Sequence, residues 1–345
     1  MTSKHSQRKN EHVSLAEKFY STPKNADFNR VKFIHQSLPE INLSDIDYST
    51  YLGHLKLKCP FYIEAMTGGS EQTKKLNARL AQIANATGIA MACGSQSIAL
   101  ADSSLIDTFS IIRHYDKNGV VIANMSASHS LDDAIKVVKM INANALEIHI
   151  NAPQELIMPE GDRSFYWLDQ IKAINDHFNL PIIIKEVGYG MAKETIQKLL
   201  DAGIKIVNVS GRGGTNFAKI ENFRRPDQDL FYLNDWGQTT VQSLLEAQSV
   251  HRHPEIIASG GIQTPLDIAK ALCLGANAVG IAGEMLHLLI HNSNDEIIKI
   301  IKQWQAGLKI IMTMLGCRNI YDLQQQKLLL DEKLLNYIKQ RHIKY

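Results

Sequence analysis

The sequence predicts an α/β protein in which eight parallel strands and their helices close into a (β/α)8 TIM barrel. Its 345 residues fall within the length of a single barrel with insertions. Short β-rich apolar runs alternate along the chain with longer segments of helical periodicity. The interiors of these runs are almost continuously apolar, which is typical of parallel strands covered by helices. A doubly wound open sheet of this size would usually have fewer strands, so the barrel is favoured.

The strands and helices follow one another in a regular order. The apolar runs place the strands at residues 61–66, 90–93, 120–124, 145–150, 181–186, 206–210, 256–259 and 278–282. Amphipathic spacing predicts outer helices that include residues 134–141, 193–202 and 266–274. We expect a single domain over residues 1–345, with an N-terminal extension (1–60), a barrel core (61–283) and C-terminal helices (284–345). The extension and the long connection at 211–254 are expected to shape the site.

Composition and charge exclude several classes of protein. Hydrophobic residues make up 45% of the chain, and its formal net charge of +2 is too mild for a nucleic-acid surface. The four cysteines lie far apart without a C-x-x-C pair, so they indicate neither a zinc site nor a disulfide framework. No apolar run approaches the roughly 18 residues of a membrane span, and the polar N-terminus does not resemble a signal peptide. A cytoplasmic protein is expected.

Polar side chains gather where the expected strands end, which is where barrel enzymes carry their active sites. The first three strands lead into small or amide-bearing residues, and the fourth leads into the densest polar cluster, at 149–155. The fifth carries Lys185 inside an aliphatic run, where an unpaired charge would be costly. Either an anionic ligand or a salt bridge to a neighbouring strand would remove that cost.

Glycine-rich segments follow the last three expected strands, at 210–215, 259–261 and 282–283. Glycine allows backbone N–H groups to converge on an anion at the start of a helix, and loops in this position commonly bind phosphate. Together with Lys185 and the amides of the first strands, these loops are what a barrel needs to hold FMN. Lys185 could lie near the N1–C2 carbonyl edge of the flavin, where positive charge stabilises the reduced anion.

Several motifs together identify the chain as similar to a known family. They are Arg8-Lys9-Asn10-Glu11-His12, Ala65-Met66-Thr67-Gly68-Gly69-Ser70, Gly94-Ser95-Gln96, His149-x-Asn151-x-x-Gln154-Glu155, Met158-Pro-Glu-Gly-Asp-Arg163, Lys185-Glu-Val-Gly188, Gly211-x-Gly-Gly-Thr215 and Ala258-Ser-Gly-Gly261. Over nearly its whole length the chain resembles the type 2, FMN-dependent isopentenyl-diphosphate isomerases. The resemblance implies that the residues contacting FMN are Ala65, Met66, Thr67, Ser95, Asn124, Lys185, Ser210, Thr215, Gly260, Gly261, Ala282 and Gly283.

The resemblance also implies a substrate site. The residues that it assigns to the substrate are Arg8, Lys9, His12, His149, Asn151 and Gln154, with Glu155 binding Mg²⁺ against the diphosphate. The segment around Arg8 and Lys9 would be a flap that closes on the diphosphate, although charged residues near a terminus are commonly solvated. Many relatives have Arg after Gly-Ser-Gln, whereas this chain has Ser97, which places a diphosphate contact from that position in doubt.

The implied reaction is the conversion of isopentenyl diphosphate into dimethylallyl diphosphate. Reduced FMN would be the acid–base catalyst through N5, with NADPH only reducing it, while His149 and Gln154 assist. Trp236 could supply an aromatic wall or simply pack. Family members form tetramers or octamers, so a homo-oligomer is expected.

Two other functions remain to be weighed. An FMN-dependent 2-hydroxy-acid oxidase would share the phosphate loops and Lys185, but it needs a basic His–Arg pair near the flavin, and no His lies between Ser210 and Thr215. A barrel that binds flavin or phosphate without turnover is disfavoured because the site residues Lys9, His149, Gln154 and Glu155 are all present.

Overall fold

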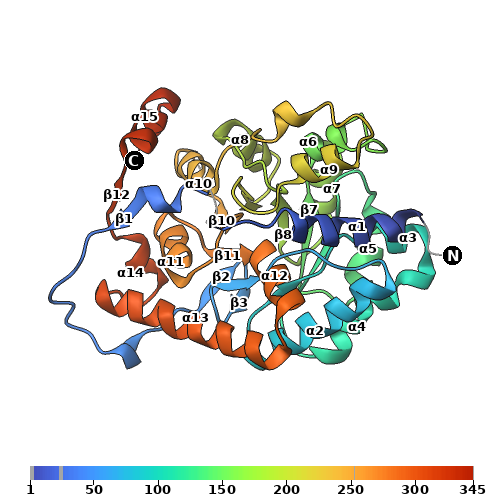
Figure 1. Ribbon diagram of the computed structural model, residues 1–345. Helices are drawn as coiled ribbons and strands as arrows, with labels where there is room; N and C mark the ends of the chain where they lie inside the picture. The colour runs from blue at the N-terminus through green and yellow to red at the C-terminus, as the bar shows by residue number, and fades with distance from the viewer. Residues whose placement is uncertain (1–3, 23–25, 252, 345) are drawn as a thin grey trace.

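The computed structural model describes residues 4–22, 26–251 and 253–344. Eight strands form a closed parallel barrel in the order β10-β11-β4-β5-β6-β7-β8-β9, surrounded by helices (Figure 1). The barrel strands are β4 (Phe61–Ile63), β5 (Met91–Ala92), β6 (Val121–Ser126), β7 (Ala145–His149), β8 (Ile182–Lys185), β9 (Ile206–Asn208), β10 (Glu255–Ser259) and β11 (Ala278–Ile281). Each expected strand is present, so the predicted fold class is confirmed.

Some strands end earlier than the sequence predicts. β4 stops at Ile63: the Glu64 N–H still donates to the Ile281 carbonyl of β11, but the Ala65 N–H donates to the Glu64 carboxylate instead of to a neighbouring strand. β9 stops at Asn208, whose side-chain oxygen accepts a hydrogen bond from the Ser210 N–H, and Ser210 itself has a positive φ of 34°. In both places a strand side chain turns the backbone out of the sheet, and the turn begins at the cavity described below.

Helices cover the outside of the barrel between successive strands. They are α2 (Glu71–Thr87), α3 (Ser97–Ala101), α4 (Asp107–Tyr115), α5 (Leu131–Met140), α6 (Ala152–Ile157), α7 (Leu168–His177), α8 (Lys193–Asp201), α9 (Phe217–Arg224), α10 (Thr240–Gln248) and α11 (Pro265–Cys273). Three of them, α5, α8 and α11, lie where amphipathic spacing predicts them. Several begin with a Ser or Thr N-cap in a capping box, as Ser130 does before α5.

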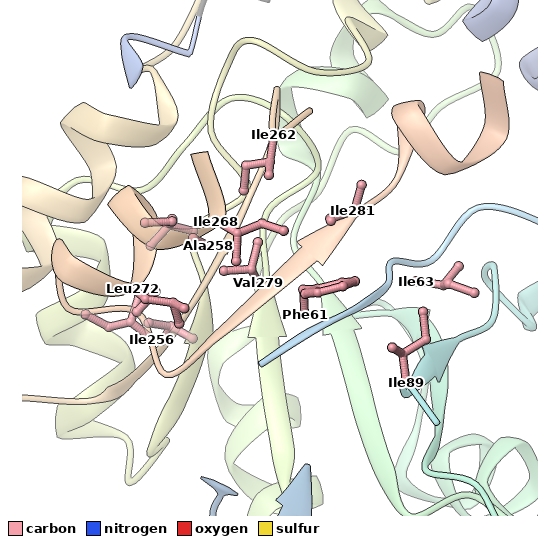
Figure 2. Packing of buried hydrophobic residues seen from close by; sticks show 14 of the residues in the cluster. Phe61, Ile63, Ile89, Ile256, Ala258, Ile262, Ile268, Leu272, Val279 and Ile281 are labelled. Atoms are coloured by element: carbon pink, nitrogen blue, oxygen red, sulfur yellow. The ribbon is translucent and has the colours of Figure 1, made fainter. Parts of the chain in front are cut away.

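Both faces of the barrel strands are buried, one against the surrounding helices and the other inside the barrel. Val279 and Ile256 point outward toward Ile268 and Leu272 of α11 (Figure 2). Phe61 also points outward, and its ring meets that of Trp304 edge to face. The alternate residues point inward and form a second cluster that includes Tyr62, Ala90, Ile122, Ala145, Ile183, Ile206, Ile257 and Ala278. This alternation is the two-residue period of a β-strand. It fills the barrel at this level with buried apolar side chains.

The ends of the chain close the barrel at its rims. The hairpin β2 (Thr50–Leu52) and β3 (Leu55–Leu57) packs its leucines on the inward apolar cluster. The short strand β1 (Val31–Phe33) pairs with β12 (Leu328–Leu330), so the N- and C-terminal segments form one antiparallel ladder. The C-terminal helices are α12 (Gly283–His291), α13 (Asn294–Met314), α14 (Ile320–Gln324) and α15 (Glu332–Arg341). No helix in the described part of the chain has the length and apolar character needed to cross a membrane.

Candidate active site

A cavity of about 530 Å³ lies at the carboxyl ends of the barrel strands, beneath the N-terminal helix α1 (Lys4–Lys18). A volume of this size is within the usual range for cofactor and ligand sites. All but one of the residues predicted for the site line it: Arg8, Lys9, His12, Ala65, Met66, Ser95, Asn124, His149, Asn151, Gln154, Glu155, Lys185, Ser210, Thr215, Gly260, Gly261, Ala282 and Gly283. The structure thus brings residues as far apart in sequence as Arg8 and Gly283 into one chamber.

Two residues named from the sequence lie elsewhere. Thr67 is buried outside the cavity wall, and its hydroxyl donates to the Asn77 side chain, so any contact of Thr67 with a cofactor must come from its backbone. Trp236 is also absent from the wall, and its side chain is 60% exposed. The suggestion that Trp236 forms an aromatic wall is therefore wrong.

The floor of the cavity is a ring of inward-facing side chains two residues beyond the apolar layer of the barrel. We call this set the cavity floor; its polar members are Glu64, Asn124, Glu147, Lys185, Asn208 and Ser259. Each follows an inward apolar residue by two positions, as Lys185 follows Ile183 and Asn208 follows Ile206. All are at most 5% exposed. Strand register alone therefore brings six polar groups together.

The hydroxyl of Tyr62 lies between two buried carboxyl groups of the cavity floor, those of Glu64 and Glu147. The Tyr62 hydroxyl lies 3.0 Å from Glu64 Oε2 and 3.1 Å from Glu147 Oε1. A phenol donates only one proton, so one carboxyl group must itself donate to the Tyr62 oxygen. Burial, reinforced by the negative charge of Glu64, raises the pKa of Glu147 well above its usual value. Glu147 is therefore the carboxyl group of the pair that holds the proton.

The Glu64 carboxylate is the acidic partner of Lys185. The Lys185 Nζ lies 4.0 Å from Glu64 Oε1 and donates to the backbone carbonyl of Glu186 at 3.0 Å. β4 and β8 are not neighbours in the barrel, so this pair reaches across its interior. The sequence left open a salt bridge between Lys185 and a neighbouring strand. In the structure the acidic partner of Lys185 lies on the opposite side of the barrel instead. Lys185 remains in the cavity wall, where it can face a ligand.

The same network fixes the protonation state of His149. Asn124 donates through Nδ2 to Glu147 Oε2 at 3.1 Å, so its Oδ1 is the atom that faces His149 Nδ1 at 3.0 Å. Nδ1 must then carry the imidazole proton, which leaves Nε2 as an acceptor. Burial, with the nearby charges of Lys185 and Lys9, lowers the pKa of His149 well below its usual value. The imidazole is therefore neutral.

The glycine loops are packed so closely that only glycine fits. Gly260 has a φ of 101°, and a Cβ there would collide with the Gly211 carbonyl oxygen. Gly261 has a φ of 74°, and a Cβ there would collide with the carbonyl group of Gly213. Gly283 begins α12 beside the Thr215 hydroxyl, so backbone N–H groups of two loops meet a helix N-terminus. This cradle has the chemistry that a phosphate requires.

A second polar corner lies at the start of α6. Glu155 accepts hydrogen bonds from Asn151 Nδ2 at 2.8 Å and from the Asp162 N–H at 2.9 Å. Asn151 Oδ1 is buried and has no hydrogen-bond partner among the described residues. An oxygen ligand set of this kind, with a buried amide oxygen left unpaired, suits a hard divalent cation such as Mg²⁺.

One face of α1 covers the cavity; we call this face the lid. Its residues Arg8, Lys9, His12, Val13 and Ala16 recur at helical spacing and all line the chamber. Lys9 Nζ donates to the Ser95 carbonyl at 3.4 Å. Burial, followed by the positive charge of Arg8, lowers the pKa of Lys9 to about 8. The lid therefore presents cations to the chamber at neutral pH.

Ion pairs hold the lid against α9. Arg224 contacts three carboxylates, those of Glu221, Glu160 and Glu11, at 2.6, 2.6 and 3.3 Å. Glu221 also accepts from Gln154 Nε2 at 3.0 Å, and its Oε1 lies 2.9 Å from His12 Nε2. Burial would raise the pKa of Glu221, but contacts with His12, Gln154 and Arg224 outweigh it and lower the pKa to about 2.

Several of these residues were missed from the sequence. Glu64, Glu147 and Glu221 were not named, yet the first two are charges inside apolar strands, the same signal that pointed to Lys185. Glu221 and Arg224 lie in the long connection after β9, where no spacing rule indicates their partners. Ser97 does lie in the cavity wall, with its hydroxyl 2.9 Å from that of Ser95.

Several solved structures share the fold of this chain. Mandelate oxidase aligns with a TM-score of 0.63 at 16% identity, over 93% of this chain and 90% of that one. Flavocytochrome b2 with benzoylformate aligns at 0.65 and 20% identity, over 95% and 87%. At these identities the likeness concerns the fold. The family model for FMN-dependent dehydrogenases matches residues 106–330.

Curated relatives are much more similar in sequence. The isopentenyl-diphosphate delta-isomerase of Latilactobacillus sakei is 52% identical over 98% of this chain and 97% of the relative. The enzyme of the same name from Staphylococcus haemolyticus is 45% identical over 97% and 96%. With a matching FMN-dependent family model and relatives this similar over nearly the full length, the chain belongs to the type 2, FMN-dependent isopentenyl-diphosphate delta-isomerase family.

Proposed function

We propose that the cavity converts isopentenyl diphosphate into dimethylallyl diphosphate on reduced FMN, with Mg²⁺ on the diphosphate and NADPH as the source of reducing equivalents. One observation carries the proposal: a phosphate cradle and a cationic helix face line the same chamber. The cradle suits the phosphate of a cofactor, and the cations suit the diphosphate of a substrate. An enzyme of this family needs both.

The cofactor side is assigned to the strand ends and glycine loops. When bound and reduced, FMN would supply at N5 the proton donor and acceptor that alkene isomerisation requires. Gly260, Gly261, Gly283 and Thr215 would hold its phosphate. The remaining wall residues assigned to the flavin are Ala65, Met66, Ser95, Asn124, Lys185, Ser210 and Ala282, with Thr67 through its backbone.

The substrate side is assigned to the lid and to α6. Arg8 and Lys9 would bind the diphosphate through charge-assisted hydrogen bonds, with His12 and Asn151 beside them. Glu155 would hold Mg²⁺ together with phosphate oxygens and water. Because the lid covers the chamber, it would also exclude water from the reacting alkene.

Two neutral groups would assist next to the reacting carbons. His149 is held as a neutral imidazole with an unprotonated Nε2, so it can accept a hydrogen bond without adding positive charge. The Gln154 amide is oriented by its donation to Glu221. These residues position the substrate and can hold a proton near it.

A 2-hydroxy-acid oxidase is the second candidate because mandelate oxidase shares the fold. Such an oxidase needs a histidine base by the flavin, whereas residues 210–215 read Ser-Gly-Arg-Gly-Gly-Thr. The isomerase relatives are far more similar in sequence, so the isomerase is the better supported function.

The test is anaerobic proton NMR of isopentenyl diphosphate with the purified protein, FMN and Mg²⁺ in D2O. The proposal predicts deuterated dimethylallyl diphosphate only after the flavin is reduced by NADPH or dithionite. Conversion by dithionite but not by NADPH would overturn NADPH as the reductant. No conversion under full reduction, with FMN bound, would overturn the isomerase assignment.

A homo-oligomer, either tetramer or octamer, stays a prediction. Size-exclusion chromatography with light scattering on the holoenzyme measures it directly. A monomer at micromolar concentration would contradict the expectation.

A further inference from the structure

A cluster of one carboxylate and two imidazoles joins α1 to α12, outside the active-site residues assigned above. His287 Nδ1 lies 3.0 Å from Glu17 Oε1, and His291 Nε2 lies 2.8 Å from the same oxygen. The three possible ligand atoms all lie within 4.8 Å of one another. Their side chains are 25%, 32% and 52% exposed for Glu17, His287 and His291, so an ion could enter from solvent.

The sequence places both imidazoles on one face of α12. His287 and His291 are four residues apart, the spacing at which helical side chains are neighbours, and their ring centroids are 4.6 Å apart. Two imidazoles and a carboxylate are the donor set of late first-row transition ions, with bonds of about 2.0–2.2 Å. Tetrahedral ligands at that bond length are about 3.4 Å apart, so the two distances from Glu17 to the imidazoles need to lengthen by only about half an ångström.

The surroundings favour a cation. His287 is stacked on Tyr20, with ring centroids 4.0 Å apart and planes at 2°, which fixes the orientation of the imidazole. Glu284, one turn earlier on α12, adds a second negative charge near Tyr20. The nearest lysine in sequence, Lys18, is directed away, with its Nζ 4.0 Å from the Phe223 ring centroid.

We propose that Glu17, His287 and His291 bind one divalent ion of the Zn²⁺ class, with water completing the coordination, and that this ion cross-links α1 to α12. The site is independent of the proposed function of the cavity, and its metal is distinct from the Mg²⁺ assigned to Glu155. Because α1 also carries Arg8 and Lys9, the ion would hold the lid over the chamber.

The binding test is a Co²⁺ titration of chelator-treated, tag-free protein in excess Mg²⁺, which occupies oxygen sites such as Glu155 without competing for imidazole. The visible spectrum of Co²⁺ distinguishes tetrahedral from octahedral coordination. We expect one equivalent with intense tetrahedral bands, displaced by Zn²⁺, and at least a 100-fold loss of affinity in H291A and E17Q. H54A/H177A, which removes two exposed histidines elsewhere, should bind as the native chain does.

A second readout separates metal binding from misfolding. Zn²⁺ should slow hydrogen exchange of the α1 backbone at least tenfold in the native protein and not in H291A, whose substituted side chain is half exposed. Equal Co²⁺ affinity in H291A, a purely octahedral spectrum, or unchanged exchange of α1 with Zn²⁺ would each overturn the proposal. None of these measurements requires FMN or substrate, so their outcome is separate from that of the NMR assay.

Discussion

The cavity floor and the lid are held by different kinds of contact. On the floor, Glu64, Glu147 and Lys185 are fixed by strand register, are almost fully buried, and bond to one another through short links such as the Tyr62 hydroxyl. The lid belongs to a single helix, α1, which is tied down by long side chains, chiefly those of Arg224 and Glu17. The floor is therefore preorganised before any ligand arrives, whereas the lid can open by breaking a few ion pairs.

The largest effects are expected when the two buried carboxyl groups of the floor are replaced, one at a time, by amides. Glu64→Gln removes the partner of buried Lys185 and is expected to lower the free energy of unfolding by about 3–5 kcal/mol. Glu147→Gln replaces an already neutral group of similar shape and should change it by less than about 1 kcal/mol at pH 5. Urea unfolding of both variants measures the difference. Equal losses would contradict the assignment of the shared proton to Glu147.

The raised pKa of Glu147 also predicts how the free energy of unfolding changes with pH. Because the folded-state pKa of Glu147 is raised above its ordinary value of 4.5, the folded protein retains a proton that the unfolded chain loses above that pH. Stability contributed by this group is thus complete below pH 4.5 and declines as pH rises, by up to about 1.4 kcal/mol per unit. Glu147→Gln should lack this decline. A parallel pH profile in variant and native protein would refute the raised pKa.

A substitution in the glycine cradle tests whether the phosphate site tolerates a change in its backbone. Gly260→Ala would force a side chain against the Gly211 carbonyl at positive φ, a combined cost of roughly 2–4 kcal/mol. We expect FMN affinity, measured by flavin fluorescence, to fall at least about 30-fold. Gly88→Ala is the matched control because Gly88 also has a positive φ but faces open space. Unchanged FMN affinity in Gly260→Ala would remove the cradle from the phosphate site.

Lys9 tests the lid alone. Lys9→Ala should lower kcat/KM for isopentenyl diphosphate by about 10- to 100-fold through loss of a charge-assisted contact, with FMN affinity unchanged. Because the pKa of Lys9 is lowered to about 8, native kcat/KM should fall as pH rises through 8, where Lys9 loses its proton. Lys9→Arg keeps its charge and should flatten that fall. A persistent decline in Lys9→Arg would assign it to another group.

The smallest expected effect concerns Ser97, a cavity-wall residue at a position where many relatives have Arg. Ser97→Arg would add a cation beside the lid, and a solvated ion pair of this kind contributes about 0.5–1 kcal/mol. KM for isopentenyl diphosphate should therefore fall about two- to fivefold in steady-state assays. A rise in KM would show that Ser97 faces the alkene and not the diphosphate.

The positions of the floor residues follow a periodic rule that can be applied to the sequence, whereas the contacts that hold the lid follow no such rule. The two-residue period that turns Ile183 inward also turns Lys185 inward, so one rule places the fold and much of the site. Applied to Phe-Tyr-Ile-Glu64 and Ala-Leu-Glu147, the same rule would have found both carboxylates. Contacts such as Arg224 with Glu11 join segments 213 residues apart through flexible side chains, and no local period specifies them.

The most direct test of the account is a crystal structure of the protein with FMN and isopentenyl diphosphate bound. The account predicts the FMN phosphate on the backbone N–H groups of Gly261 and Gly283, the flavin ring beside Lys185, and the substrate diphosphate between Lys9 and Glu155. A flavin phosphate bound instead by Arg8 and Lys9, with the glycine cradle unused, would contradict it.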